Sequence, residues 1–184
     1  MKLPSIQGIP LEYIQSILKI DSTSPSGLTW LPREDGQWNG RYANENAGSK
    51  SINAKDGYQL WKTIITYNGK NHCLKCSRII FLLHNGYLTE GKQIDHDDGN
   101  SLNNKGSNLR ESTGSQNSQN RKKPKNNTSG HKGVSWNEAS GKWMVQIYVN
   151  GKSYYFGLYV NKEDAIKVAI AARKKLHGEF WRDE

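Results

Sequence analysis

The chain has 184 residues, of which 34% are hydrophobic, and its formal net charge is +9 at pH 7. The mean hydropathy of -0.84 argues against one large core, so we expect small modules lying against a charged partner. A positive surplus of this size also serves general solubility, but in a short chain it is more typical of nucleic-acid binding.

The sequence shows neither a membrane-spanning segment nor a secretion signal. No apolar run is long enough to span a bilayer, and MKLPSIQGIP lacks the apolar stretch of a secretion signal. We therefore predict a cytoplasmic protein that does not contact membranes. Cys73 and Cys76 form a single C-x-x-C without the second pair that a zinc ribbon needs, so we expect reduced thiols and no zinc.

The N-terminal residues, 1–56, have the least regular pattern. LEYIQSILKI (11–20) has apolar residues at helical spacing and follows Pro10, which predicts a helix. LTWL (28–31) predicts a short strand, and residues 32–56 predict loop or weak structure. We therefore treat this part as a weakly defined lead-in.

A clearer pattern begins at Gly57. GYQLWKTIITY predicts a strand, an Asn-Gly pair predicts a two-residue hairpin turn, and NHCLKC predicts the returning strand. SRIIFLLHNG predicts a short buried helix that stops at Gly86. A polar helix is predicted from about Thr113 to Lys122, because Thr113 and Gln116 have the spacing of a capping box.

The last third of the chain predicts a small α+β module. RKKPKNNTSG is basic and broken by Pro124, which predicts a tether that also touches phosphates. HKGVSW, KWMVQIYV and SYYFGLY alternate like strands, Asn150-Gly151 predicts a second hairpin turn, and a helix follows. The predicted organisation is a lead-in (1–56), a first domain (57–122), a basic linker (123–131) and a sheet-and-helix domain (132–184).

Residues 94–100, IDHDDGN, are the candidate for chemistry. An EF-hand calcium loop is excluded, because neither register places acids at positions 1, 3 and 5 with glycine at position 6. A polar turn and a nuclease centre remain. Phosphodiester hydrolysis needs a base, for which histidine is suited, and a cation, for which Asp and Asn oxygens are suited.

The order of motifs favours the nuclease centre. Between about Arg78 and Arg121 the chain carries DH, DGN, NN, NLR and T-x-x-x-N-x-x-N in that order. This span resembles the HNH endonucleases, whose site is a ββα-metal fold of two strands and one helix around one divalent cation.

The resemblance implies a role for four residues. His96 resembles the general base, Asp95 the first metal ligand, and Asn117 the second metal ligand on the helix. Asn108 resembles the asparagine that orients the histidine and braces the loop. The implied cofactor is one Mg²⁺ or Mn²⁺ per site. The neighbouring acids and amides have simpler roles: Asp97 and Asp98 are predicted to form the turn, and Asn103 and Asn104 to form the loop.

The segment from about Asn127 to Phe180 resembles the AP2 DNA-binding domain, in which a three-stranded sheet lies in the major groove and a helix backs it. The matching residues are SGHKGVSW, GKWMVQI, NGKSYYFGLY and EDAIKVAIAARKKLHGEF. Alternation predicts that one face of the sheet packs on the helix, namely Val134, Trp143, Val145, Ile147, Tyr154 and Phe156. The residues predicted to contact DNA are Arg121, Lys122, Lys123, Lys125, Lys132, Ser135, Asn137, Lys142, Met144, Gln146, Tyr148, Ser153 and Tyr155.

An HNH part followed by an AP2 part resembles the homing endonucleases of phages and introns. The implied function is metal-dependent cleavage of double-stranded DNA, in the cytoplasm of a bacterial host cell if the chain is phage-encoded. One alternative is a catalytically silent DNA-binding regulator that uses the sheet, and a weaker one is an RNA-binding protein. Protein partners, the target site, and nicking versus double-strand cleavage stay open.

Overall fold

The computed structural model describes residues 4–34, 36, 39–121, 123–124 and 126–182. The chain divides into two compact units, Met1–Glu111 and Ser112–Glu184, which we call the N-terminal unit and the C-terminal unit. Each is described by itself. This division differs from the predicted domains, because the division falls after Glu111 and not in the basic stretch 123–131.

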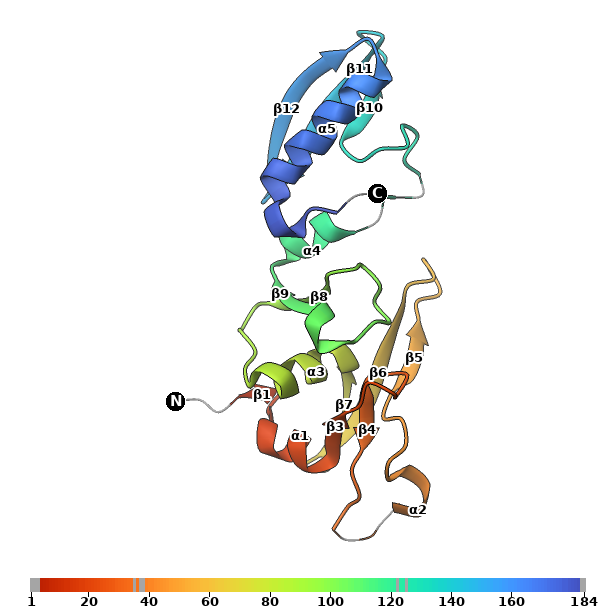
Figure 1. The fold of residues 1–184 in the computed structure, drawn as a ribbon, viewed down its shortest axis with the longest axis vertical. Helices are drawn as coiled ribbons and strands as arrows, with labels where there is room; N and C mark the ends of the chain where they lie inside the picture. Colours follow the sequence, from red (N-terminus) through yellow and green to blue (C-terminus); the bar gives the residue numbers. More distant parts are fainter. Residues whose placement is uncertain (1–3, 35, 37–38, 122, 125, 183–184) are drawn as a thin grey trace. The chain divides into compact units, whose positions relative to one another are not determined.

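The N-terminal unit is built around a buried helix, α3, and includes the lead-in in its core. Ile9 and Ile14 are fully buried in the same apolar cluster as Ile79, Ile80 and Leu82 of α3. The lead-in, whose sequence pattern is the least regular, therefore contributes buried residues to the core of this unit. Its elements are β1 (Ser5–Ile6), β2 (Ile9–Pro10), α1 (Leu11–Ile17), β3 (Leu18–Ile20), β4 (Leu28–Trp30), α2 (Asn39–Tyr42), β5 (Ser49–Ile52), β6 (Gln59–Tyr67), β7 (Lys70–Lys75), α3 (Cys76–Asn85), β8 (Gln93–His96), the short 3₁₀ helix η1 (Gly106–Asn108) and β9 (Leu109–Ser112), whose last residue opens the next unit (Figure 1).

Local signals in the sequence predicted several of these elements correctly. The β6–β7 hairpin turns at Asn68 and Gly69, whose φ angles of 50° and 70° lie in the left-handed region that such a turn requires. Helix α3 ends at Gly86, also left-handed, whose N–H donates to the Leu82 carbonyl over 2.8 Å. The helix predicted over residues 11–20 is shorter, because Leu18–Ile20 pair with β4 as a strand.

The C-terminal unit is a three-stranded antiparallel sheet, in the order β10-β11-β12, with α5 packed on one face. Val134 and Val145 of the sheet are buried against Ala169 of the helix. Tyr154, predicted for the same face, remains 39% exposed. The elements are α4 (Gly114–Asn120), β10 (Val134–Asn137), β11 (Lys142–Val149), β12 (Lys152–Tyr159), α5 (Lys162–His177) and the 3₁₀ helix η2 (Gly178–Phe180).

The predicted α+β class therefore agrees with the observed mixture of small helices and antiparallel sheets. In the described part of the chain, no helix combines the length and apolar character that a bilayer crossing would require.

Candidate active site

Two polar side chains are buried where β8 ends. Asp95 is 5% exposed and His96 is 9% exposed. The chain then turns sharply: the Gly99 N–H donates to the His96 carbonyl over 2.8 Å, and Gly99 has a φ of 63°. The predicted turn therefore follows directly on the two residues that resemble the catalytic pair.

His96 is held by a residue that the sequence assigned only to loop formation. Its ring nitrogen Nε2 lies 3.0 Å from Oδ1 of Asn104, which is itself buried. The amide of Asn104 in turn donates through Nδ2 to the main-chain carbonyl of Ser26 over 2.9 Å. A chain of hydrogen bonds thus connects His96 to the N-terminal lead-in.

This chain of contacts fixes which ring nitrogen of His96 carries hydrogen. The Ser26 carbonyl accepts only, so the Asn104 atom facing it is the donor Nδ2, and Oδ1 faces the histidine. Oδ1 also accepts only, so Nε2 of His96 must donate to it. In the neutral ring the lone pair then lies on Nδ1, the nitrogen that can take up a proton.

A glycine makes room for this arrangement. Gly27 has a φ of +81°, and a Cβ built there would lie 2.8 Å from Cδ1 of Ile80 and 3.3 Å from Cβ of Asn104. Both the backbone conformation and the close approach exclude a larger residue at position 27 without movement of its neighbours.

Asp95 is paired with an arginine from the adjacent strand. Nε and Nη2 of Arg110 each lie 3.2 Å from Oδ2 of Asp95. Nη1 of the same guanidinium contacts Oδ1 of Asp97. The charge of the buried Asp95 carboxylate is thereby balanced within the unit, as a buried charge requires.

Asn108 braces the turn, as predicted, but its hydrogen bonds do not reach His96. Its Oδ1 accepts from the Asp98 N–H over 3.0 Å, while its Nδ2 donates to Oδ1 of Asp98 and to the Asn103 carbonyl. The orienting contact that was expected of Asn108 is instead made by Asn104. The side-chain oxygen and nitrogen of Asn108 are engaged in hydrogen bonds within the turn.

The carboxylate of Asp98 is stabilised in this turn. Burial by itself raises the pKa, but hydrogen bonds from the Asn103 side chain, the Asn100 N–H and the Asn108 side chain outweigh it and lower the pKa below its ordinary value. Asp98 therefore remains ionised and acts as an acceptor that closes the loop.

Asn117 lies on α4, in the C-terminal unit. The start of this helix was predicted correctly: Thr113 accepts from the Gln116 N–H, and Gln116 accepts from the Thr113 N–H, which completes a capping box. Within its unit α4 contacts η2, and Oγ of Ser115 accepts a hydrogen bond from the Asn150 N–H over 3.1 Å. The C-terminal unit therefore holds the helix that carries Asn117.

The residues predicted to contact DNA on the sheet do share one face. Residues directly opposite each other in antiparallel strands point to the same side of the sheet. The strand register pairs each predicted DNA contact on the sheet with another predicted contact. Tyr148 and Tyr155 are 68% and 60% exposed on this side. The cross-strand pairs are Ser135 with Met144, Asn137 with Lys142, Gln146 with Tyr155, and Tyr148 with Ser153.

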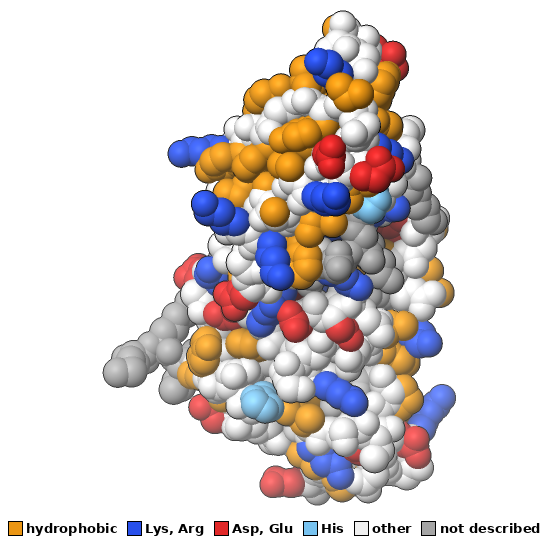
Figure 2. Space-filling model, turned by 45° about the horizontal axis from the view of Figure 1, so that its top comes forward, with side chains coloured by type: hydrophobic (Ala, Val, Ile, Leu, Met, Phe, Trp, Pro, Cys, Tyr) orange, Lys and Arg blue, Asp and Glu red, His pale blue; other side chains and the backbone are white. Residues whose placement is uncertain are grey.

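The basic residues of the predicted tether are only partly described. Nζ of Lys123 donates to the Gly130 carbonyl over 2.7 Å, and Nζ of Lys132 donates to the Arg121 carbonyl. Lys122 and Lys125 lie outside the described residues. Figure 2 shows Lys and Arg side chains scattered over the visible face with acidic side chains among them, so the charge does not form one continuous patch there.

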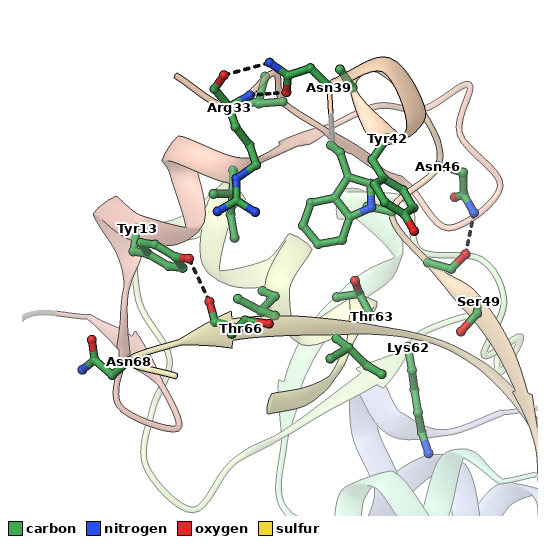
Figure 3. A pocket seen from close by; sticks show the side chains of 18 of the residues that line it. Tyr13, Arg33, Asn39, Tyr42, Asn46, Ser49, Lys62, Thr63, Thr66 and Asn68 are labelled. Atoms are coloured by element: carbon green, nitrogen blue, oxygen red, sulfur yellow. Dashed lines mark hydrogen bonds between the residues drawn. The ribbon is translucent and has the colours of Figure 1, made fainter. Parts of the chain in front are cut away.

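A large cavity of the N-terminal unit does not include the candidate site. It has a volume of about 990 Å³, and none of the residues predicted for catalysis or metal binding lines it. Tyr13 forms one wall, where its hydroxyl donates to the Thr66 carbonyl over 2.8 Å, and the side chains of Arg33 and Tyr42 lie at the cavity as well (Figure 3).

Comparison with known proteins agrees with this geometry. Residues 75–119, from the end of β7 to α4, match the HNH endonuclease family. Protein 3.8 of Escherichia phage T7 is 40% identical over 101 residues, which cover 53% of this chain and 80% of Protein 3.8. The chain belongs to the Protein 3.8 family and carries an HNH endonuclease domain. No solved structure matches it.

The HNH domain implies a divalent cation, and the chemistry of its donors fits one. Asp95 and Asn117 would supply a carboxylate and an amide oxygen, the hard ligands that Mg²⁺ and Mn²⁺ prefer. Among the described residues, no group of three or more His, Cys, Asp or Glu side chains gathers as a metal site would. The expected ligand set contains only one such residue and would not form such a group.

Sequence reasoning missed Ser26, Asn104 and Arg110. Asn104 and Arg110 are both in the quoted motifs, NN and NLR, but an amide and a cation in a polar loop do not reveal which partner they meet. Ser26 contributes only a main-chain carbonyl, so no pattern of side chains could have identified it.

Proposed function

We propose that this chain is a metal-dependent DNA endonuclease that hydrolyses phosphodiester bonds with His96 as its general base. The observation that carries the proposal is the buried contact between His96 and Asn104 inside the HNH domain. It holds the imidazole at the strand end with Nε2 as donor, which leaves Nδ1 as the basic nitrogen of the neutral ring.

In this mechanism Nδ1 of His96 takes a proton from water as the water oxygen forms a bond to phosphorus. The bond from phosphorus to the 3′ oxygen then breaks. A divalent cation, when bound, neutralises charge on the phosphate and on the leaving oxygen. Asn104 keeps the ring oriented through the step and accepts a stronger hydrogen bond once the ring becomes positively charged.

Asp95 and Asn117 are the residues we propose as metal ligands. Asp95 is near the end of β8, where its carboxylate contacts Arg110. Asn117 is proposed from its place in the HNH pattern, on a capped helix of the matched span.

We further propose that the exposed sheet face of the C-terminal unit holds the DNA in the manner of an AP2 domain. The face offers amide, hydroxyl, cationic and aromatic groups and carries no acid among its predicted contacts. Such groups bind phosphates and base edges. An HNH domain joined to such a face resembles the arrangement of a homing-type enzyme, and we propose that this chain is of that type.

One observation favours the alternative of a catalytically silent DNA-binding regulator. Arg110 contacts the carboxylate of Asp95, the residue that would have to bind the cation. In the endonuclease, Asp95 must release or share this arginine when metal binds. In the regulator, the ion pair would be permanent and would only support the fold.

Cleavage of plasmid DNA separates the two functions. The wild type should nick or linearise supercoiled plasmid with Mg²⁺ or Mn²⁺ and should be inactive with a chelator. His96→Ala should lower the rate about 10²- to 10⁴-fold, because the general base is lost, while DNA binding is retained.

His72→Ala provides the matched control, since His72 is also in the N-terminal unit, on β7. It should cleave as the wild type does. If no divalent metal supports cleavage, or if His96→Ala cleaves as fast as the wild type, the endonuclease assignment is wrong.

A further inference from the structure

A cationic pocket lies in the C-terminal unit, where it borders Gln146 and Tyr148 of the face proposed to hold DNA. Its volume is about 600 Å³. It opens beside the second half of β11. Strand β10 pairs only with Lys142–Val145, so residues 146–149 of β11 have no strand neighbour on that side. Its walls come from α4, from the Asn150-Gly151 turn and from the last turns of α5.

Three basic side chains converge on this pocket. Arg173 and His177 come from α5, one helical turn apart, and Lys132 comes from the segment before β10. Arg173 is only 2% exposed, so its charge is held deep in the unit. The described lining contains no Asp or Glu.

Several buried polar atoms at this end of the unit have no hydrogen-bond partner among the described residues. Both ring nitrogens of His177, Nε1 of Trp181 and Nη1 of Arg182 are buried without a hydrogen-bond partner among the described residues. Buried polar atoms in folded proteins nearly always have partners, so each such atom calls for an explanation. Of these residues His177 lines the pocket, and a ligand with acceptor oxygens would supply a partner for its ring N–H.

His177 is sensitive to the charges around it. Burial, followed by the positive charges of Arg173 and Lys132, lowers its pKa to about 4, so the ring is neutral near pH 7. An anion entering the pocket would offset those two charges and accept a hydrogen bond from the ring N–H.

We propose that the pocket formed by Lys132, Arg173 and His177 binds a phosphate group, and that a backbone phosphate of DNA is its source. A phosphate presents several acceptor oxygens to guanidinium, ammonium and imidazole donors at once. The net charge of +9 favours a polyanion over a free anion as the source. The pocket adds a phosphate contact to the proposed DNA binding and does not depend on cleavage.

Titration with inorganic phosphate and with a short duplex, both without divalent metal, tests the pocket directly. The ring resonances of His177, followed by NMR and assigned with His177→Gln, should shift saturably with each ligand. A shift with phosphate but not with duplex would overturn DNA as the source. The absence of a shift with both would overturn the pocket. Neither result depends on His96, so both are distinct from a failure of the nuclease assignment.

Salt dependence of duplex binding provides the second measurement. Lys132→Gln should weaken binding and make the slope of log affinity against log salt shallower by about 0.9, the change for one lost phosphate contact. Lys175→Gln is the matched control, since Lys175 is exposed on α5 and does not line the pocket, and it should affect the slope less. Arg173→Lys, which keeps the buried charge, should bind with the wild-type slope if the protein is folded. Equal slopes for Lys132→Gln and the wild type would contradict the proposal.

Discussion

At the scale of single residues, the candidate base is oriented by a neutral amide. A histidine next to a carboxylate is oriented by an ionic partner, whereas His96 is oriented by the neutral Oδ1 of Asn104. A neutral acceptor favours the protonated ring less than a carboxylate would. This is suitable for a base that must be unprotonated at the start of the reaction.

Substitution of Asn104 tests this arrangement. Asn104→Ala leaves the buried Nε2–H of His96 without its acceptor, which costs about 1–3 kcal/mol. If this cost falls on the transition state, turnover should fall about fivefold to 150-fold with little change in KM. Asn104→Asp should stabilise the protonated ring, so the acidic limb of the pH–rate profile should move to higher pH.

Asn103→Ala is the control for these variants, because Asn103 bonds Asp98 in the same loop and not His96. It should destabilise the turn without moving the pH profile. A profile for Asn104→Asp that coincides with the wild type would show that Asn104 does not act on the base.

At the scale of elements, the junction of β7 and α3 separates two cysteines by burial. Cys73 is exposed, whereas Cys76 opens α3 and is fully buried. Burial raises the pKa of the Cys76 thiol to about 12. The thiolate is the reactive form of cysteine, so the two positions should differ strongly in reactivity.

Titration with a thiol reagent checks this difference. The native protein should expose one fast-reacting thiol, and denaturation should release the second. Cys73→Ser should remove the fast phase and leave the slow one. A fast-reacting thiol in native Cys73→Ser, as in native Cys76→Ser, would contradict the burial of Cys76.

The elements that could be predicted from sequence are those fixed by neighbours in the chain. The Asn68-Gly69 turn, the Gly86 helix stop and the Thr113–Gln116 capping box all depend on residues within four positions of one another. The end of α1 could not be predicted from neighbouring residues, because Leu18–Ile20 form a strand only by pairing with β4. The same limit applies to the site, where Asp95 and His96 were found but their partners were not.

At the scale of the whole molecule, the lead-in is a structural part of the N-terminal unit. Ile14 of α1 is 0% exposed in the core that also contains α3. The C-terminal unit has separate buried clusters beneath α5. Damage to one core should therefore lower the stability of its own unit first.

Ile14→Ala should destabilise the N-terminal unit by about 2–5 kcal/mol, the usual cost of truncating a buried isoleucine. Denaturant unfolding followed by NMR should show the resonances of this unit disappearing at lower denaturant, while those around Ala169 keep their midpoint. Ile52→Ala, at a position that is 61% exposed on β5, should leave both midpoints nearly unchanged. Equal loss of stability in both units after Ile14→Ala would show that they unfold as one.

The contact between Asn104 and the Ser26 carbonyl joins residues 78 positions apart in the chain. The ribosome makes Ser26 long before Asn104, and neither can orient His96 until the N-terminal unit has folded. We therefore expect a truncated or newly made chain to contain the DH pair without a positioned base. The proposed active site is therefore assembled only when residues near the start of the chain have folded against the loop that follows β8.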